Sequence, residues 1–94
     1  MLDAVVVGQI IQQFREQKKQ SQELTSGLAG IGRTHLSAIE RGERKPTLET
    51  FFKIADVLGV RPSIIMAAIE EKLKKNSILG ALPIAKERTS RSPG

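Results

Sequence analysis

Side chains that could act in catalysis or bind a metal are few in this chain. His35 is its one histidine, and cysteine is absent, so the sequence offers neither a disulfide nor a cysteine-based metal site. The closest carboxylate pair, Glu70 and Glu71, is adjacent in a helix-forming segment, where neighbouring side chains diverge. We find no glycine-rich phosphate loop and no Ser/His/Asp arrangement, so we expect neither an enzyme nor a cofactor.

Basic residues outnumber acidic ones, which favours a polyanionic partner. Fifteen Lys and Arg stand against ten Asp and Glu, giving a formal net charge of +5 over 94 residues. Lys and Arg bind polyanions by displacing condensed counterions from phosphates. No apolar run approaches the roughly 18 residues that span a membrane, and residues 1–7 lack the positive region of a signal peptide. We therefore expect a soluble cytoplasmic protein without a membrane partner.

Helical periodicity begins near the N-terminus. A stripe at i, i+3, i+4 and i+7 predicts a first helix over residues 5–18, through Val7, Ile10, Ile11 and Phe14. Ser21 is a good N-cap for a short second helix that ends near Leu28. Gly32 can cap a third helix over residues 33–41, which Gly42 ends.

The second half of the chain predicts two further helices and a tail. Thr47 caps a fourth helix closed by Gly59, and Pro62 can begin a fifth. We expect their buried stripes to comprise Leu48, Phe51, Phe52, Ala55 and Leu58, then Ile65, Ala68, Ile69 and Leu73. After Lys75 the pattern breaks down. The expected organisation is one domain over residues 1–75 and a tail over 76–94, apolar at first, then basic and flexible.

The segment Ala29-Gly30-Ile31-Gly32 joins two short helices by a tight turn. Gly30 adopts left-handed backbone geometry at low cost, and Ile31 can fill the angle between the helices. This arrangement, within a bundle of other helices, is typical of a helix-turn-helix.

The run Leu36-Ser-Ala-Ile-Glu-Arg-Gly42, followed by Pro46-Thr-Leu-Glu49, is highly specific. It closely resembles the Cro/phage-repressor type of helix-turn-helix, often called the XRE type. The resemblance covers roughly residues 7–73. It implies an all-α fold, a compact five-helix lambda-repressor-like DNA-binding domain with a short C-terminal tail, and double-stranded DNA as partner.

The second helix departs from the family pattern. The family usually has Leu at the position of Thr25 and Ala at that of Ser26, and an apolar residue at that of Gln20. Here Leu24 and Leu28 lie one residue earlier than expected. We therefore expect a slightly rotated second helix, with Leu24 filling the space that the family residue fills.

By resemblance, the third helix is the one that reads bases. Arg33 and Thr34 occupy its first turn, where Arg33 can fork onto guanine O6 and N7 and Thr34 can contact a base. Ser37 lies one turn further on the same side, and Ala38 beside it would also allow close approach. His35 stands at a position that often holds an aromatic residue, which implies a base or phosphate contact. Thr34, His35 and Ser37 could equally be ordinary helix-surface residues.

The resemblance also implies phosphate contacts. Gln22 looks like the family's phosphate clamp at the start of the second helix. Arg41, Arg44 and Lys45 follow the recognition helix and should meet phosphates, although Arg41 could instead pair with Glu40 or Glu43. We expect Glu40 to be structural, because a carboxylate facing DNA would repel phosphates. Five apolar residues are expected to be core only: Leu36, Ile39, Phe51, Phe52 and Leu58.

These observations predict a sequence-specific transcription regulator, a repressor that binds a two-fold-symmetric operator as a homodimer. The paired recognition helices would enter successive major grooves, about 34–36 Å apart. The pairing surface is expected on apolar parts of the fifth helix and on residues 78–84, which could alternatively fold back on their own domain. Two other functions stay open: an antitoxin that binds a small toxin protein and autoregulates, and a controller of a restriction–modification operon.

Overall fold

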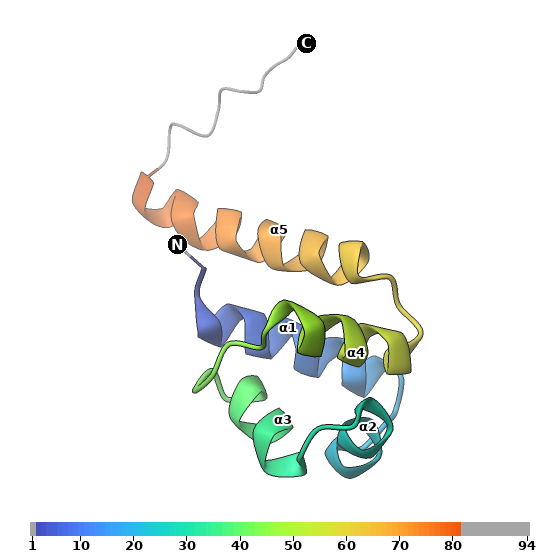
Figure 1. Ribbon diagram of the computed structural model, residues 1–94. Coiled ribbons are helices and arrows are strands. Elements are labelled where there is room, and N and C mark those ends of the chain that lie inside the picture. Colours follow the sequence, from blue (N-terminus) through green and yellow to red (C-terminus); the bar gives the residue numbers. More distant parts are fainter. Residues whose placement is uncertain (1, 82–94) are drawn as a thin grey trace.

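The computed structural model describes residues 2–81, which form five helices and no strand (Figure 1). They are α1 (Ala4–Gln17), α2 (Gln22–Ala29), α3 (Arg33–Glu40), α4 (Leu48–Leu58) and α5 (Pro62–Ala81). The expected all-α class and all five helices are confirmed. Within residues 2–81 no helix combines the length and apolarity that crossing a membrane requires. Most of the expected tail, residues 82–94, lies outside the described residues.

The helix ends follow from short-range side-chain chemistry. The side chains of Ser21 and Thr47 accept hydrogen bonds from the amides of Leu24 and Thr50, at 3.0 and 3.1 Å, which confirms both predicted N-caps. Asp3 does the same for α1, at 2.9 Å from the amide of Val5. With Asp3 as its N-cap, α1 begins at Ala4, one residue earlier than the prediction, which did not include this cap.

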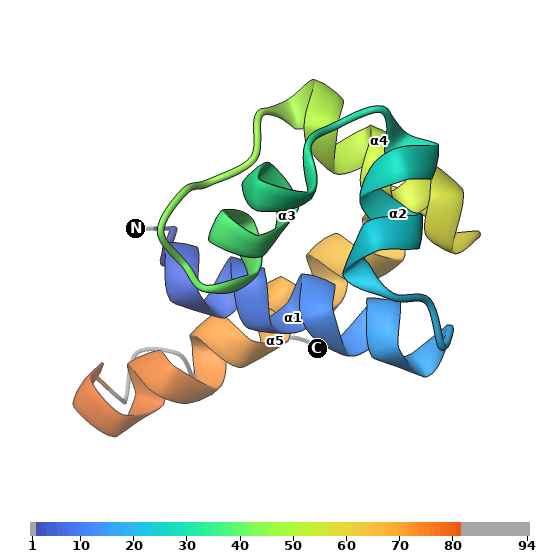
Figure 2. The same ribbon diagram turned by 90° about the horizontal axis from the view of Figure 1, so that it is seen from below.

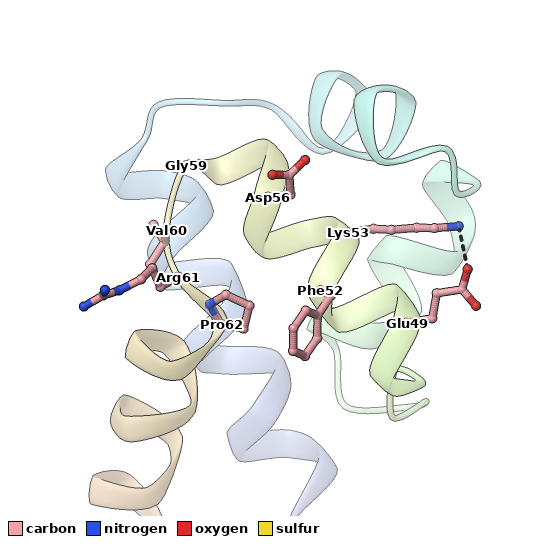
Figure 3. Close-up of a pocket in the computed structure, with 8 residues that line it drawn as sticks. All are labelled: Glu49, Phe52, Lys53, Asp56, Gly59, Val60, Arg61 and Pro62. Carbon is pink, nitrogen blue, oxygen red and sulfur yellow. Dashed lines mark ion pairs between the residues drawn. The ribbon is translucent and has the colours of Figure 1, made fainter.

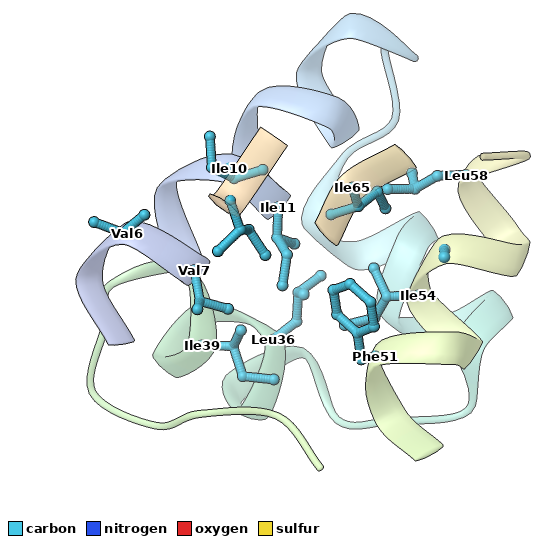
Figure 4. Packing of buried hydrophobic residues seen from close by; sticks show 12 residues of the cluster. Val6, Val7, Ile10, Ile11, Leu36, Ile39, Phe51, Ile54, Leu58 and Ile65 are labelled. Atoms are coloured by element: carbon cyan, nitrogen blue, oxygen red, sulfur yellow. The ribbon is translucent and has the colours of Figure 1, made fainter. Parts of the chain in front are cut away.

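The core lies where α1, α3, α4 and α5 meet (Figure 4). The predicted apolar stripes of α1, α3 and α5 face this core, α4 contributes part of its predicted stripe, and α1 packs against both α3 and α5. The core cluster consists of Val6, Val7, Ile10, Ile11, Leu36, Ile39, Phe51, Ile54, Ala55, Leu58, Ile65 and Ile69. The apolar stripe of α5 therefore packs inside the domain: Ile65 and Ile69 belong to the core, and Ala68 and Leu73 lie against it.

Three expectations about α4 and α5 are wrong. Phe52 was expected in the core but is 54% exposed, and Leu48 is also exposed. The cause is helix geometry: α4 turns Phe51, Ile54 and Leu58 inward, which leaves Phe52 about 100° away from Phe51 on the outer side. In addition, α5 does not stop near residue 75 but continues to Ala81.

The rotation expected for α2 is also wrong. Leu24 and Leu28 are 48% and 60% exposed, whereas Thr25 is fully buried. The Thr25 hydroxyl donates to Gln20 Oε1 at 2.8 Å, and Gln20 Nε2 donates to the carbonyl of Val57 at 3.1 Å. These hydrogen bonds connect α2 to α4 and satisfy the hydroxyl of Thr25 and the amide of Gln20. Thr25 can therefore stay buried, and α2 does not rotate to place a leucine there.

Candidate nucleic-acid interface

The helix-turn-helix is formed by α2, α3 and the turn between them, on the side of the domain opposite α5 (Figures 1 and 2). Gly30 has a φ of +73°, the left-handed geometry that the sequence predicted. The amide of Ile31 donates to the carbonyl of Ser26 at 3.0 Å, and its side chain packs against the core. Ile31 thus anchors the turn to the core, and its place in the angle between the two helices stays a prediction.

The outer face of α3 brings most of the predicted base-reading residues together. Arg33 and Thr34 are exposed in the first turn, and Ser37 is half-buried one turn later. With Arg41 they line a shallow hollow open to solvent. His35 is half-buried and does not line this hollow.

Ala38 is more buried than the other residues predicted to contact bases. It is only 8% exposed, because the turn of α3 that directs Ser37 outward directs Ala38 inward beside Ile39. Ala38 therefore offers little surface to DNA, and its expected contact stays a prediction. Base contacts by Arg33, Thr34, Ser37 and His35 stay predictions.

Arg41 folds back along α3 and forms what we call the Arg41 clasp, comprising Ser37, Arg41 and Glu43. Its guanidinium pairs with the Glu43 carboxylate through two hydrogen bonds, of 2.9 Å from Nε and 3.0 Å from Nη2. Nη1 also donates to the hydroxyl of Ser37. The guanidinium lowers the pKa of Glu43, so the carboxylate is ionised and the pair is formed at neutral pH. Of the two partners expected for Arg41, Glu43 is the one observed.

The clasp should weaken DNA binding, because Arg41 must leave Glu43 to meet a phosphate. We expect Glu43→Gln to raise the affinity for both cognate and random DNA severalfold, since a positive charge is released and a negative one removed. The measurement is a fluorescence-anisotropy titration at several salt concentrations. Glu71→Gln is the matched control, because it makes the same change of charge at an exposed carboxylate on α5, on the side of the domain opposite the helix-turn-helix. Equal gains in both variants would mean that net charge, and not the clasp, is responsible.

A buried ion pair joins α1 to the end of α3. Arg15 Nε and Nη2 donate to the two carboxylate oxygens of Glu40, at 2.6 and 2.9 Å, and Nη1 donates to the carbonyl of Gln20 at 2.8 Å. Arg15 and Glu40 are 8% and 6% exposed. The hydrogen bond to Glu40 raises the pKa of Arg15, so the guanidinium stays charged. The structural role expected for Glu40 is confirmed.

The role of Arg15 was missed from the sequence, although a signal existed. Arg15 continues the i, i+4 series of Val7 and Ile11, so it had to lie on the buried face of α1. A buried arginine needs a carboxylate partner. Glu40 was already expected to be structural, and it was the natural candidate.

The predicted phosphate-binding residues lie at both ends of the helix-turn-helix. Gln22 is half-buried at the start of α2, and its amide nitrogen donates to Glu40 Oε1 at 2.9 Å. The buried ion pair thus also holds the predicted phosphate clamp. Arg44 and Lys45 are exposed in the loop that follows α3. Their phosphate contacts and that of Gln22 stay predictions.

Comparison with known proteins agrees with this geometry. Residues 11–65 match a family model described as "Helix-turn-helix". Over 55 residues, 58% of this chain and 71% of the relative, the chain is 36% identical to y4dJ of Sinorhizobium fredii, named an uncharacterized HTH-type transcriptional regulator. Over 71 residues, 76% of this chain, it is 35% identical to the immunity repressor protein of Bacillus phage phi105. The match spans about half of that repressor's length, 48%.

A solved structure gives the same result in three dimensions. The restriction-modification controller protein C.AhdI from Aeromonas hydrophila superposes with a TM-score of 0.66 at 32% sequence identity. The match covers 69% of this chain and 98% of the controller protein. The likeness therefore extends over nearly the whole of that protein.

Proposed function

The chain belongs to the XRE-type helix-turn-helix family of DNA-binding transcription regulators, and from this premise we propose that it is a repressor that binds a two-fold-symmetric operator as a homodimer. It would act in the compartment that holds its DNA, which we infer to be the cytoplasm. The phage immunity repressor among its relatives supports the repressor function.

The outer face of α3 is the observation that carries this proposal. Arg33 and Thr34 are exposed in the first turn of α3, the part of a recognition helix that approaches base edges. The N-cap is Gly32, whose lack of a side chain leaves room for DNA at this end of the helix. Arg33 can donate two parallel hydrogen bonds to guanine O6 and N7, the commonest sequence-specific contact in the major groove.

The small number of base contacts supports a dimer. A single recognition helix with Arg33, Thr34 and Ser37 offers few base-specific hydrogen bonds. Each good bidentate contact discriminates by only about 1–3 kcal/mol. Two half-sites about one helical turn apart, as in other dimeric helix-turn-helix proteins, would supply the missing affinity and specificity.

We expect Arg33→Ala to weaken binding to the cognate site by roughly 1–3 kcal/mol while changing binding to random DNA much less. The site is first obtained by selection from a random duplex library and then titrated at several salt concentrations. Gln22→Ala is the comparison variant, and it should weaken binding to all sequences more evenly. Equal losses on cognate and random DNA in the Arg33 variant would rule out its base-reading role.

A controller of a restriction–modification operon is the second candidate. The favouring observation is the similarity to C.AhdI over 98% of that protein. The DNA sequence obtained by selection distinguishes the candidates. If the chain is a controller, the same sequence should occur in the genome of its source, in the promoter region of restriction–modification genes. The antitoxin hypothesis stays open and would be supported by co-purification of one small, unrelated protein at fixed stoichiometry.

A further inference from the structure

The outer side of α4 and its surroundings carry four large apolar side chains that are about half exposed. Leu48 and Phe52 lie one turn apart on α4 and are 65% and 54% exposed. Leu2, before α1, and Met66, on α5, are 45% and 44% exposed. We call the surface of these four residues the Leu48–Phe52 face. Soluble monomers rarely leave large apolar side chains clustered in this way, so the face is expected to be covered by a partner.

The four side chains belong to one continuous surface. Leu2, Leu48 and Met66 line a small, mainly apolar hollow of about 100 Å³, in which Phe51 also takes part. Phe52 continues this surface along α4, and its ring lies toward Pro62 at the start of α5 (Figure 3). The face therefore runs from the N-terminus across α4 to the beginning of α5.

The charges around Phe52 fit a second copy of the same surface. A wider hollow beside Phe52 is lined by two acidic residues, Glu49 and Asp56, and two basic ones, Lys53 and Arg61. Lys53 Nζ lies 3.5 Å from Glu49 Oε2. This rim sums to zero formal charge, and Lys45 beside the apolar hollow adds one positive charge to the face, whereas the whole chain carries +5. Two copies meeting here avoid much of their mutual repulsion, and acids of one copy can face bases of the other.

From this surface we propose that a second copy of the chain docks on the Leu48–Phe52 face. The inference rests on the proposed homodimeric function and gives the dimer a location. The face contains none of the residues on the outer side of α3, so both recognition helices stay open to DNA. It narrows the pairing surface expected on the apolar parts of α5 to Met66, because Ile65 and Ile69 are buried in the core. Of the other expected segment, residues 82–84 lie outside the described residues.

The test is sedimentation equilibrium of the full chain, with Leu48→Glu as the variant. We expect a reversible dimer for the wild type and a dimer dissociation constant at least about 30-fold higher in the variant, as for loss of a central apolar anchor. Phe52→Glu should act in the same direction. Leu28→Glu is the matched control: Leu28 is 60% exposed on α2 but lines neither hollow of this face, so its variant should dimerise like the wild type.

DNA titrations separate this inference from the proposed function. Leu48→Glu should bind a single half-site like the wild type but lose the tight binding to the full operator. If Leu48→Glu and Phe52→Glu dimerise normally, the docking site is wrong while the dimeric regulator stands. If the wild type is monomeric at all concentrations and does not pair on the operator, both the dimer and its docking site are wrong. A monomeric wild type that Leu48→Glu destabilises would show that the chain's own tail covers the face.

Discussion

Glu40→Ala is expected to lower the free energy of unfolding by about 3–5 kcal/mol, because it leaves the buried guanidinium of Arg15 without its carboxylate. Arg15 is 8% exposed and donates two hydrogen bonds to Glu40. The exposed carboxylate of Glu16 lies 4.0 Å from Arg15 Nη2, too far for a hydrogen bond, so it offsets only part of the loss. Arginine keeps its proton in proteins even when it is buried, so the guanidinium does not escape by losing its charge. Urea denaturation followed by circular dichroism gives the measurement.

Two comparisons separate the loss of this pair from other effects of the substitution. Glu49→Ala breaks an exposed ion pair with Lys53 and should change stability by less than about 0.5 kcal/mol. The double variant Arg15→Met, Glu40→Leu removes both charges and should be much closer to the wild type than Glu40→Ala alone. If Glu40→Ala proves no more destabilising than Glu49→Ala, the buried charge is not held as we describe.

Gly8→Ala is expected to destabilise the domain by about 3 kcal/mol, at the upper end of overpacking effects. A Cβ at this position would lie 2.7 Å from the carbonyl oxygen of Glu40 and closer still to that of Ile39. Both are backbone atoms, so relief requires α1 and α3 to move apart. Because that movement would also strain the Arg15–Glu40 pair, the two predictions are coupled. Thermal and urea denaturation of the variant measure the loss.

Gly27→Ala is the matched control for Gly8→Ala. Gly27 also lies inside a helix, but an added Cβ would meet nothing within 4 Å. There alanine should stabilise the domain by up to about 1 kcal/mol, through its higher helix propensity. Effects of opposite sign at the two glycines would establish the close approach of α1 to α3. A neutral Gly8→Ala would contradict it.

The helices and the helix-turn-helix could be predicted because their signals are local. Ser21 and Thr47 cap helices through amides three residues ahead, and Gly30 ends α2 by its own backbone preference. Apolar residues at helical spacing marked the buried faces of α1, α3 and α5. The face of α3 that carries Arg33, Thr34 and Ser37 followed from the same spacing together with the family resemblance.

The errors concern residues whose environment depends on distant parts of the chain. Phe52 is as apolar as its buried neighbour Phe51, and Leu24 is more apolar than the buried Thr25 beside it, but the packing of α4 and α2 turned both Phe52 and Leu24 outward. Thr25 is polar yet buried, because Gln20 supplies its hydrogen bond and bridges to Val57 on α4. Composition and periodicity do not indicate such compensation, which requires groups from three segments to meet.

The sequence by itself therefore determined most of the helix ends, the turn between α2 and α3 and the exposure of Arg33 and Thr34, since capping and periodicity act over a few residues. The tertiary structure alone decided which residues these elements bring together. It joined Arg15 to Glu40 across 25 positions and pressed Gly8 against the backbone of α3. It also folded Arg41 onto Ser37 and Glu43, and within residues 2–81 it left the Leu48–Phe52 face exposed. Such contacts depend on the angles at which whole helices pack, and helix packing is set by the combined shape of many side chains.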